Sequence, residues 1–185
     1  MRYSALLILF LSAGPILAQE PGSGEATALS FSRSMSIPLN ALQLFDQTVE
    51  AWKWTFGKEP GAKIMRQERE TGVLEGTARV NFRSAMLPGR EETMGTITYE
   101  VQLHIRAGEC RVVVSNLSHT GNKTTRIGGI HMGQLMRSDT DAPPCRGLGR
   151  GNAVRLHAEL REAATARINQ LLQTMEGRIR AQAEP

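Results

Sequence analysis

Three segments of the sequence alternate between apolar and polar residues with a period of two. They cover residues 73–82, 96–106 and 110–117. Because successive side chains of a β-strand point to opposite faces, each segment predicts a strand with one apolar and one polar face. This alternation is typical of an antiparallel sheet that packs on one face and meets solvent on the other. The residues expected to face inward are Leu74, Gly76, Ala78, Val80, Phe82, Ile97, Tyr99, Val101, Leu103, Ile105, Cys110, Val112 and Val114.

Two other segments repeat apolar residues at spacings of three and four, which indicates amphipathic helices. Weaker strand patterns cover residues 31–37 and 62–68. The order strand, helix, four strands, helix predicts an α+β fold in which both helices pack on one face of a mostly antiparallel sheet. The first helix opens after Pro38 and Asn40, and we expect Asn152 to cap the second. The two apolar stripes are Leu39, Leu42, Phe45, Val49, Trp52 and Phe56, and then Leu156, Leu160, Ala164, Ile168, Leu171, Met175 and Ile179.

The composition is that of one globular domain. The chain has 185 residues, of which 41% are apolar, with 22 Lys and Arg against 18 Asp and Glu. A net charge of +4 is too small to indicate a nucleic-acid partner. We expect a single domain over residues 31–182, interrupted by a long irregular loop over residues 120–151 that is rich in glycine.

The N-terminus has the parts of a secretory signal peptide. Arg2 supplies the positive charge, residues 5–11 form a short apolar run, and Ala18 is a small residue at the expected cleavage position. We therefore predict a signal peptide over residues 1–18, a flexible leader over residues 19–30, and an exported protein, periplasmic or secreted, with no transmembrane segment after signal removal. The alternative is a membrane anchor, but the apolar run is far shorter than the roughly 20 residues that a spanning helix needs.

The chain contains two cysteines, Cys110 and Cys145, whose state depends on whether the protein is exported. In an oxidising compartment this even pair is compatible with one disulfide. Free cysteines are also among the most frequently buried residues, so two separate buried thiols are the alternative. Sequence does not show whether the two Cα atoms come within reach, and both interpretations stay open.

Several local features occur together in an order that resembles a known family. A helix ends in a Trp-centred apolar stretch over residues 51–56, Glu68 precedes the hairpin Gly72 by four residues, and Gly76 follows in the next strand. A last strand follows a tight turn over residues 108–116. In these features residues 37–120 resemble a secreted bacterial family of unknown function that has a TATA-binding-protein-like (TBP-like) fold. The resemblance implies this fold and export, and the family name describes shape rather than DNA binding.

The sequence lacks the residue patterns of common catalytic and metal centres. It contains no G-x-S-x-G, and none of its four histidines stands in an H-E-x-x-H spacing. His131, Met132 and Met136 offer ligands that suit Cu(I), but a short apolar patch is the favoured interpretation of the methionines. We therefore expect no enzyme activity, no cofactor and no metal site.

A glycine-rich segment precedes the last helix. Gly147, Gly149 and Gly151 alternate with other residues beside Arg146 and Arg150. A helix N-terminus with two arginines nearby suits an anion. The favoured interpretation is a flexible entry loop, because glycines of this kind are common in loops.

The polar face of the predicted sheet is the candidate binding surface. Polar residues on the wet side of a sheet need no function, but exposed sheets are also common recognition platforms. Our leading hypothesis is a non-enzymatic module that docks an unknown protein or envelope component. The alternative is a carrier of a small hydrophobic ligand, with a cavity between helix and sheet where Gly76 and Ala78 leave room. The candidate surface comprises Arg79, Glu100, Gln102, His104, Arg106 and Arg111.

Overall fold

The computed structural model describes residues 27–87, 89–126 and 128–183. Five long strands and two long helices follow in the predicted order: β1 (Phe31–Ser36), α1 (Ala41–Trp54), β2 (Lys63–Glu68), β3 (Val73–Phe82), β4 (Gly95–Arg106), β5 (Glu109–Gly121) and α2 (Arg150–Ala183). A two-residue strand, β6 (Gly133–Gln134), lies between β5 and α2. The predicted signal peptide, and the predicted leader up to residue 26, lie outside the described residues.

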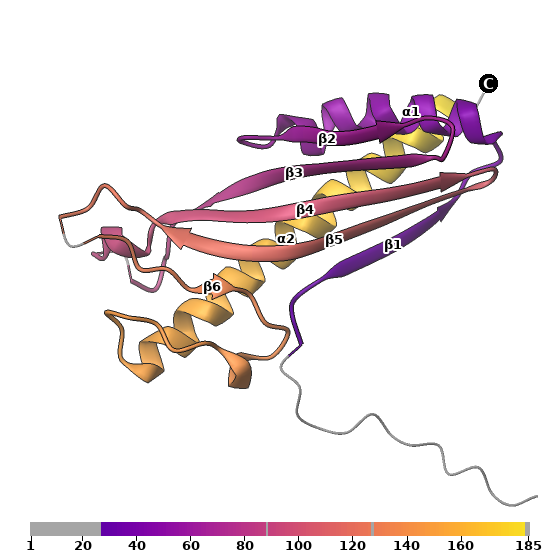
Figure 1. The fold of residues 1–185 in the computed structure, drawn as a ribbon. Helices are drawn as coiled ribbons and strands as arrows, with labels where there is room; N and C mark the ends of the chain where they lie inside the picture. The colour runs from indigo at the N-terminus through magenta and orange to yellow at the C-terminus, as the bar shows by residue number, and fades with distance from the viewer. Residues whose placement is uncertain (1–26, 88, 127, 184–185) are drawn as a thin grey trace, which may run out of the picture.

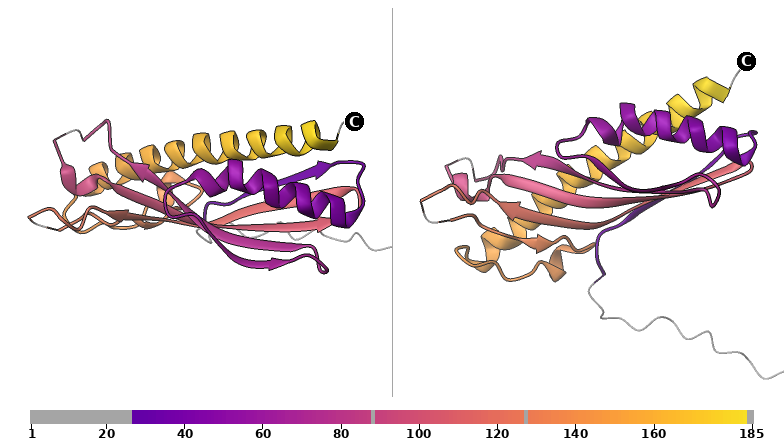
Figure 2. Two further views of the ribbon diagram at one scale, coloured as in Figure 1. Left: turned by 90° about the horizontal axis from the view of Figure 1, so that it is seen from above. Right: turned by 45° about the horizontal axis from the view of Figure 1, so that its top comes forward.

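The strands form one antiparallel sheet in the order β1-β5-β4-β3-β2, and β6 pairs with β5. Both helices lie on the same face of this sheet, with α2 crossing the strands diagonally (Figures 1 and 2). The predicted α+β class, the element order and the two-helix layer are thus confirmed. Within the described ranges, no helix is both long and apolar enough to cross a membrane.

The predicted alternation holds along β3 and β4 and along the first part of β5. In β5 the alternation changes phase at Asn116, whose φ of 56° places it in the left-handed region. Asn116 and Leu117 together face Tyr99 of β4, because Thr98 pairs with Ser118. This is a β-bulge, and it turns Leu117 and later odd-numbered residues inward. Beyond the bulge β5 goes on pairing with β4 as far as Gly121, past the predicted end at residue 117.

Helix α1 begins where the sequence predicts but buries a wider face. The Asn40 side chain accepts a hydrogen bond from the Gln43 N–H at 2.9 Å, which caps the helix. Leu42, predicted to be in the core, is 47% exposed. The helix contacts α2 as well as the sheet, so its buried face is rotated toward Leu44, Thr48 and Ala51.

Helix α2 begins two residues before the predicted cap. Its first residue is Arg150, and the Ala153 N–H bonds to the Gly149 carbonyl at 3.0 Å. Asn152 therefore lies inside the first turn, and the prediction that it caps the helix is wrong. All seven residues of the predicted apolar stripe are buried: Leu156, Leu160, Ala164, Ile168, Leu171, Met175 and Ile179.

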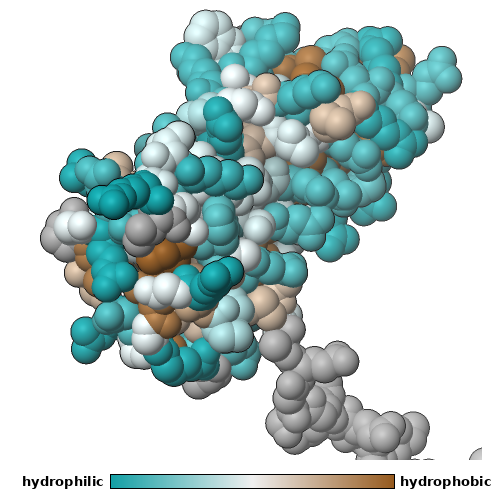
Figure 3. Space-filling view, turned by 60° about the vertical axis from the view of Figure 1, so that its left-hand side comes forward, coloured by the Kyte–Doolittle hydropathy of each residue, from teal (hydrophilic) through white to brown (hydrophobic). Residues whose placement is uncertain are grey.

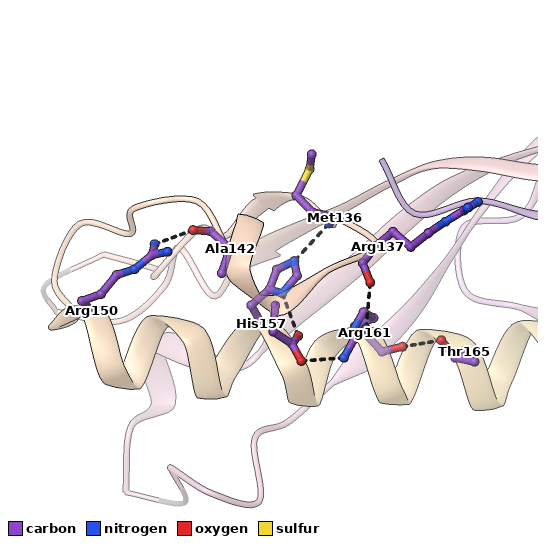
Figure 4. A network of polar contacts seen from close by, with 8 residues as sticks. Met136, Arg137, Ala142, Arg150, His157, Arg161 and Thr165 are labelled. Carbon is purple, nitrogen blue, oxygen red and sulfur yellow. Dashed lines mark hydrogen bonds and ion pairs between the residues drawn. The ribbon is translucent and has the colours of Figure 1, made fainter. Parts of the chain in front are cut away.

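The predicted 120–151 loop is largely irregular, and a polar network fastens part of it to α2 (Figure 4). His157 is fully buried, and its Nε2 accepts from the Met136 N–H at 3.0 Å. Its Nδ1 faces Asp139 at 3.4 Å, so the ring proton lies on the carboxylate side. Arg161 donates to Asp139 at 2.6 Å and to the Arg137 carbonyl at 2.7 Å. Hydrogen bonds with His157 and Arg161 of α2 thus hold residues 136–139 in place, although these residues form no regular strand or α-helix.

The folded domain begins slightly before residue 31, where the sequence predicts its start. Ala28 forms a bridge with Met136, and the Leu29 N–H donates to the Leu135 carbonyl at 2.8 Å. The Leu29 side chain is 7% exposed and belongs to the core. Ala28 and Leu29, predicted as part of a flexible leader, therefore contact the folded chain.

The two cysteines are separate thiols. Both are buried and free. Cys110 stands at the start of β5 beside the Thr48 hydroxyl. Cys145 lies beside the His131 carbonyl, in the loop region that follows the other end of β5. The strand between them separates the two residues, an arrangement that favours two separate buried thiols over a disulfide.

Candidate functional site: the exposed face of the sheet

The face of the sheet opposite the helices carries the predicted binding surface. Five of its six residues are exposed and Gln102 is half-buried. The strand register brings part of the set together, because His104 of β4 lies directly opposite Arg111 of β5. Arg79 lies on β3 opposite Thr98, several residues along the sheet from this pair.

A depression of about 350 Å³ lies on this face near the β4–β5 turn. Three predicted residues line it, together with Thr71 and Glu109, which no sequence pattern indicated. Both missed residues belong to the turn ends of the hairpins, where no period-two pattern marks an orientation. The depression is lined by Thr71, His104, Ile105, Arg106, Glu109 and Arg111.

Charge in the depression is partly neutralised. Arg106 and Glu109 form an ion pair across the strand ends, with one hydrogen bond of 3.0 Å from Arg106 Nε. The hydrogen bond from Arg106 lowers the pKa of the Glu109 carboxyl. Arg111 adds a second positive charge near Glu109. The hollow therefore contains the guanidinium of Arg106, which is paired with Glu109, and that of Arg111, both beside His104.

The hydroxyl group in the depression is not aimed at the histidine. Thr71 Oγ1 donates to Glu68 at 2.8 Å. Glu68 also receives two hydrogen bonds from Arg66, at 2.7 and 2.8 Å. The Thr71 proton is thus directed toward a carboxylate on β2, away from the ring of His104. Hydrogen bonds from Arg66 and Thr71 lower the pKa of the Glu68 carboxyl, so this carboxylate is a weak base for the Thr71 hydroxyl.

Two of the three other predicted residues line a second, smaller hollow on the same face. Glu100 and Gln102 border a depression of about 250 Å³ beside Met65, which is 61% exposed. Glu100 accepts a hydrogen bond of 2.7 Å from Asn116, the bulge residue of β5. The face therefore offers a mixed surface of charges, amides and one exposed thioether, which suits a polar protein surface better than a highly charged polymer.

Trp54 lies on the helix layer and not on the sheet face. It is 46% exposed, and its indole N–H donates to Glu50 at 3.0 Å. The Lys58 ammonium lies 4.3 Å from the ring centroid and the Arg178 guanidinium 5.4 Å. Two cations thus cover the ring in part.

Groups suited to nucleophilic or metal chemistry are dispersed. Burial raises the pKa of the Cys110 thiol to about 11, which keeps it protonated and favours packing over attack. Met132 is buried whereas His131 is exposed. Among the described residues, no three His, Cys, Asp or Glu side chains are placed to hold a metal ion.

The space between helix and sheet at Gly76 is filled. A Cβ atom at Gly76 would lie 2.7 Å from Cη2 of Trp52, which is 2% exposed. The room that the carrier hypothesis expects there is occupied by the indole ring. A different hollow between the layers, a groove of about 620 Å³, runs between the start of β1 and α2.

Comparisons with solved structures agree with this architecture. A DUF4468 family protein from Bacteroides ovatus matches with a TM-score of 0.52 and 16% identity, covering 81% of this chain and 86% of the other. A TBP-like protein from Parabacteroides distasonis matches with a TM-score of 0.54 and 10% identity, covering 80% and 93%. The predicted resemblance to a TBP-like family is therefore confirmed at the level of the fold. Neither protein-family models nor curated proteins gave a match.

Proposed function

We propose that this chain is an exported, non-enzymatic module that docks a protein or another envelope component on the exposed face of its sheet. The observation that carries the proposal is the depression at the β4–β5 turn, where the fold gathers His104, Arg106 and Arg111 on a face that the helices leave uncovered. The non-enzymatic part is supported by the environment of the Thr71 hydroxyl: its acceptor, the Glu68 carboxylate, is a weak base because hydrogen bonds from Arg66 lower the pKa of that carboxyl.

The chemistry of the depression favours a partner with a carboxylate. Arg106 is paired with Glu109, while the guanidinium of Arg111 stands across the register from Ser34 and His104. Guanidinium groups bind carboxylates with two parallel hydrogen bonds, so an acidic side chain of a partner fits beside Arg111. Exposed hydroxyl groups of Ser32 and Ser34 on β1 extend the same face with further donors and acceptors.

The test is crosslinking in the native host with the full chain. The double variant Arg106→Glu, Arg111→Glu should lose the crosslinked partner, because both changes place carboxylates where an acidic partner binds. The matched control is Arg83→Glu, Lys123→Glu, which makes the same change of charge at two exposed loop residues outside the depression. Arg79→Glu should have a smaller effect, since Arg79 lies away from the hollow. Retention of the partner by the first double variant would overturn the docking proposal.

Export is tested separately by mass spectrometry of the chain recovered from the host envelope. A mature N-terminus at Gln19 supports the signal peptide over residues 1–18. An uncut chain found in the cytoplasm would contradict export and leave the sheet-face proposal to be tested there.

A ligand carrier remains the second candidate, because a groove lies between β1 and α2. Its lining combines the apolar or small residues Leu29, Phe31, Ala158 and Ala166 with Thr165 and the charged residues Arg137, Arg161 and Glu162. This mixture suits an extended apolar ligand with a polar end. Native mass spectrometry of the protein from its own host should then show added mass that Ala158→Trp removes. A bare chain would remove support for the carrier.

A further inference from the structure

Another hollow, of about 430 Å³, lies at the other end of the β4–β5 pair, among the loops that precede β4 and follow β5. Figure 3 views the molecule from this end and shows hydrophilic side chains around a small hydrophobic patch. None of the residues that line the hollow is acidic. They are Arg90, Gly128, Gly129, Ile130, His131, Arg146 and Gly147.

Two guanidinium groups reach this hollow from separate loops. Arg90 and Arg146 are both exposed. Arg90 donates to the Gly147 carbonyl at 3.3 Å, a contact that fixes the guanidinium at the wall of the hollow and leaves its other N–H groups for a ligand. The structure describes no ion pair of Arg146 with a carboxylate in residues 27–87, 89–126 and 128–183. Two guanidinium groups with further N–H donors are suited to bind an oxyanion.

The Nε2 atom of His131 is a third donor, because Nδ1 of the same ring already accepts a hydrogen bond. Its Nδ1 accepts from the Gly121 N–H at 3.1 Å. The neutral ring must then carry its proton on Nε2, and a charged ring carries one there as well. In either state the free nitrogen of His131 presents an N–H rather than a lone pair.

The glycines of the hollow have a structural reason to be glycine and bring backbone close to a ligand. A Cβ atom at Gly129 would lie 2.5 Å from the Gly121 carbonyl carbon, and Gly128 has a φ of 81°. Residues without side chains at these positions allow a ligand to approach the main chain, as in other anion-binding loops. Packing against Gly121 therefore requires glycine at residue 129, and the open space beside Gly128 leaves its main chain accessible.

We propose that this hollow binds a phosphate group, either free or as an ester on a larger molecule. Two guanidinium groups and an imidazole N–H supply donors from three loops, and no lining side chain repels an anion. From the sequence, Arg146 and Arg150 are the candidates for anion binding. The structure replaces Arg150, which donates to the Ala142 carbonyl, with Arg90 and His131 (Figure 4). The site is independent of the sheet-face docking proposal because it uses none of the same residues.

The test is a titration of the full chain with inorganic phosphate and with glycerol 3-phosphate, followed by calorimetry and by amide NMR. We expect saturable binding at constant ionic strength, with the largest shifts at the amides of Gly128, Gly129 and Gly147. Arg90→Ala and Arg146→Ala should each weaken binding about tenfold or more, since each removes a charge-assisted contact. Lys63→Ala, the same loss of charge on β2, should leave the affinity unchanged.

The two ligands separate the two sources of phosphate. Tighter binding of glycerol 3-phosphate would assign the hollow to a phosphate ester, and tighter binding of inorganic phosphate to the free ion. Absence of saturation with both, or equal weakening by Lys63→Ala and Arg146→Ala, would overturn the proposal. The second result would mean that only the overall charge of the protein attracts the anion.

Discussion

The indole ring of Trp52 lies directly under Gly76, at 2.7 Å from the position that a Cβ atom would occupy. Trp52 also stacks on Phe56, with ring centroids 5.3 Å apart. This contact joins α1 to β3 and explains why a small residue stands in the middle of a strand that is otherwise apolar on its inner side. It also fills the space in which a ligand at this part of the interface would have to fit.

Gly76→Ala should destabilise the protein by about 2 kcal/mol, because the added methyl group overlaps both Trp52 and the Lys63 carbonyl. The measurement is urea unfolding followed by circular dichroism. Gly177→Ala is the matched control: Gly177 is exposed on α2, and no atom lies within 4 Å of the place that a Cβ atom would take there. That change should stabilise the protein by up to about 1 kcal/mol through helix propensity. Equal stability of both variants would show that Trp52 moves away without cost.

The thiols of Cys110 and Cys145 should be free and protected in the native protein. Both side chains are buried, and burial raises the pKa of each thiol. A thiol reagent should therefore modify neither residue rapidly until denaturant is added, after which two groups per chain react. The intact mass without reduction should equal that of the reduced chain. A mass lower by two hydrogens would contradict the separation of the two residues in the fold.

The sequence predicted the layers of the fold well and their local details less well. Alternation along residues 73–82 and 96–106 shows which face of each strand is buried. Burial of one face in turn determines the register in which the strands pair. The bulge at Asn116 was missed, because a change of phase depends on the partner strand rather than on residues of β5 alone. Asn152 was taken as a cap on residue type, although the helix already begins at Arg150.

Some residues of the candidate sites could likewise be placed from the sequence, and others could not. His104 and Arg111 could be placed on one face from alternation, and the register indeed sets them opposite each other. Thr71 and Glu109 could not, because turn residues follow no periodicity. Arg90 and Arg146 are 56 residues apart in the sequence, and only the folded loops bring them to one hollow. Long-range juxtaposition of this kind leaves no local pattern to detect.

The stability of the protein should fall as the pH falls below neutrality, in part because of His119. Burial lowers the pKa of this histidine to about 4, from an ordinary value of 6.5. The unfolded chain therefore binds a proton between pH 6.5 and 4 that the folded chain does not, so the stabilising contribution is complete above pH 6.5 and is lost on acidification. We expect a loss of about 2 kcal/mol between pH 7 and pH 5 from this residue.

The pH dependence is measured by urea unfolding at both pH values for wild type and His119→Asn. The amide of asparagine cannot titrate, and its oxygen is suited to replace Nδ1 as the acceptor of the Met132 N–H. The variant should start from lower stability, because a large buried side chain is shortened, but should lose less on acidification. An unchanged loss in the variant would assign the effect to other groups, of which His157 is the first, since burial lowers its pKa as well.

Trp54 and Trp52 should report opposite environments in fluorescence quenching. Trp54 is 46% exposed and Trp52 is 2% exposed. In the Trp52→Phe variant the remaining emission should lie at longer wavelength and be quenched by acrylamide, whereas in Trp54→Phe it should be protected. Lys58→Ala should increase quenching of Trp54, because the ammonium covers one part of the ring. Equal protection of both tryptophans would show that Trp54 is covered by a part of the chain outside the described residues or by a second molecule. Protection that disappears on dilution would identify the second molecule and make Trp54 an anchor of an interface.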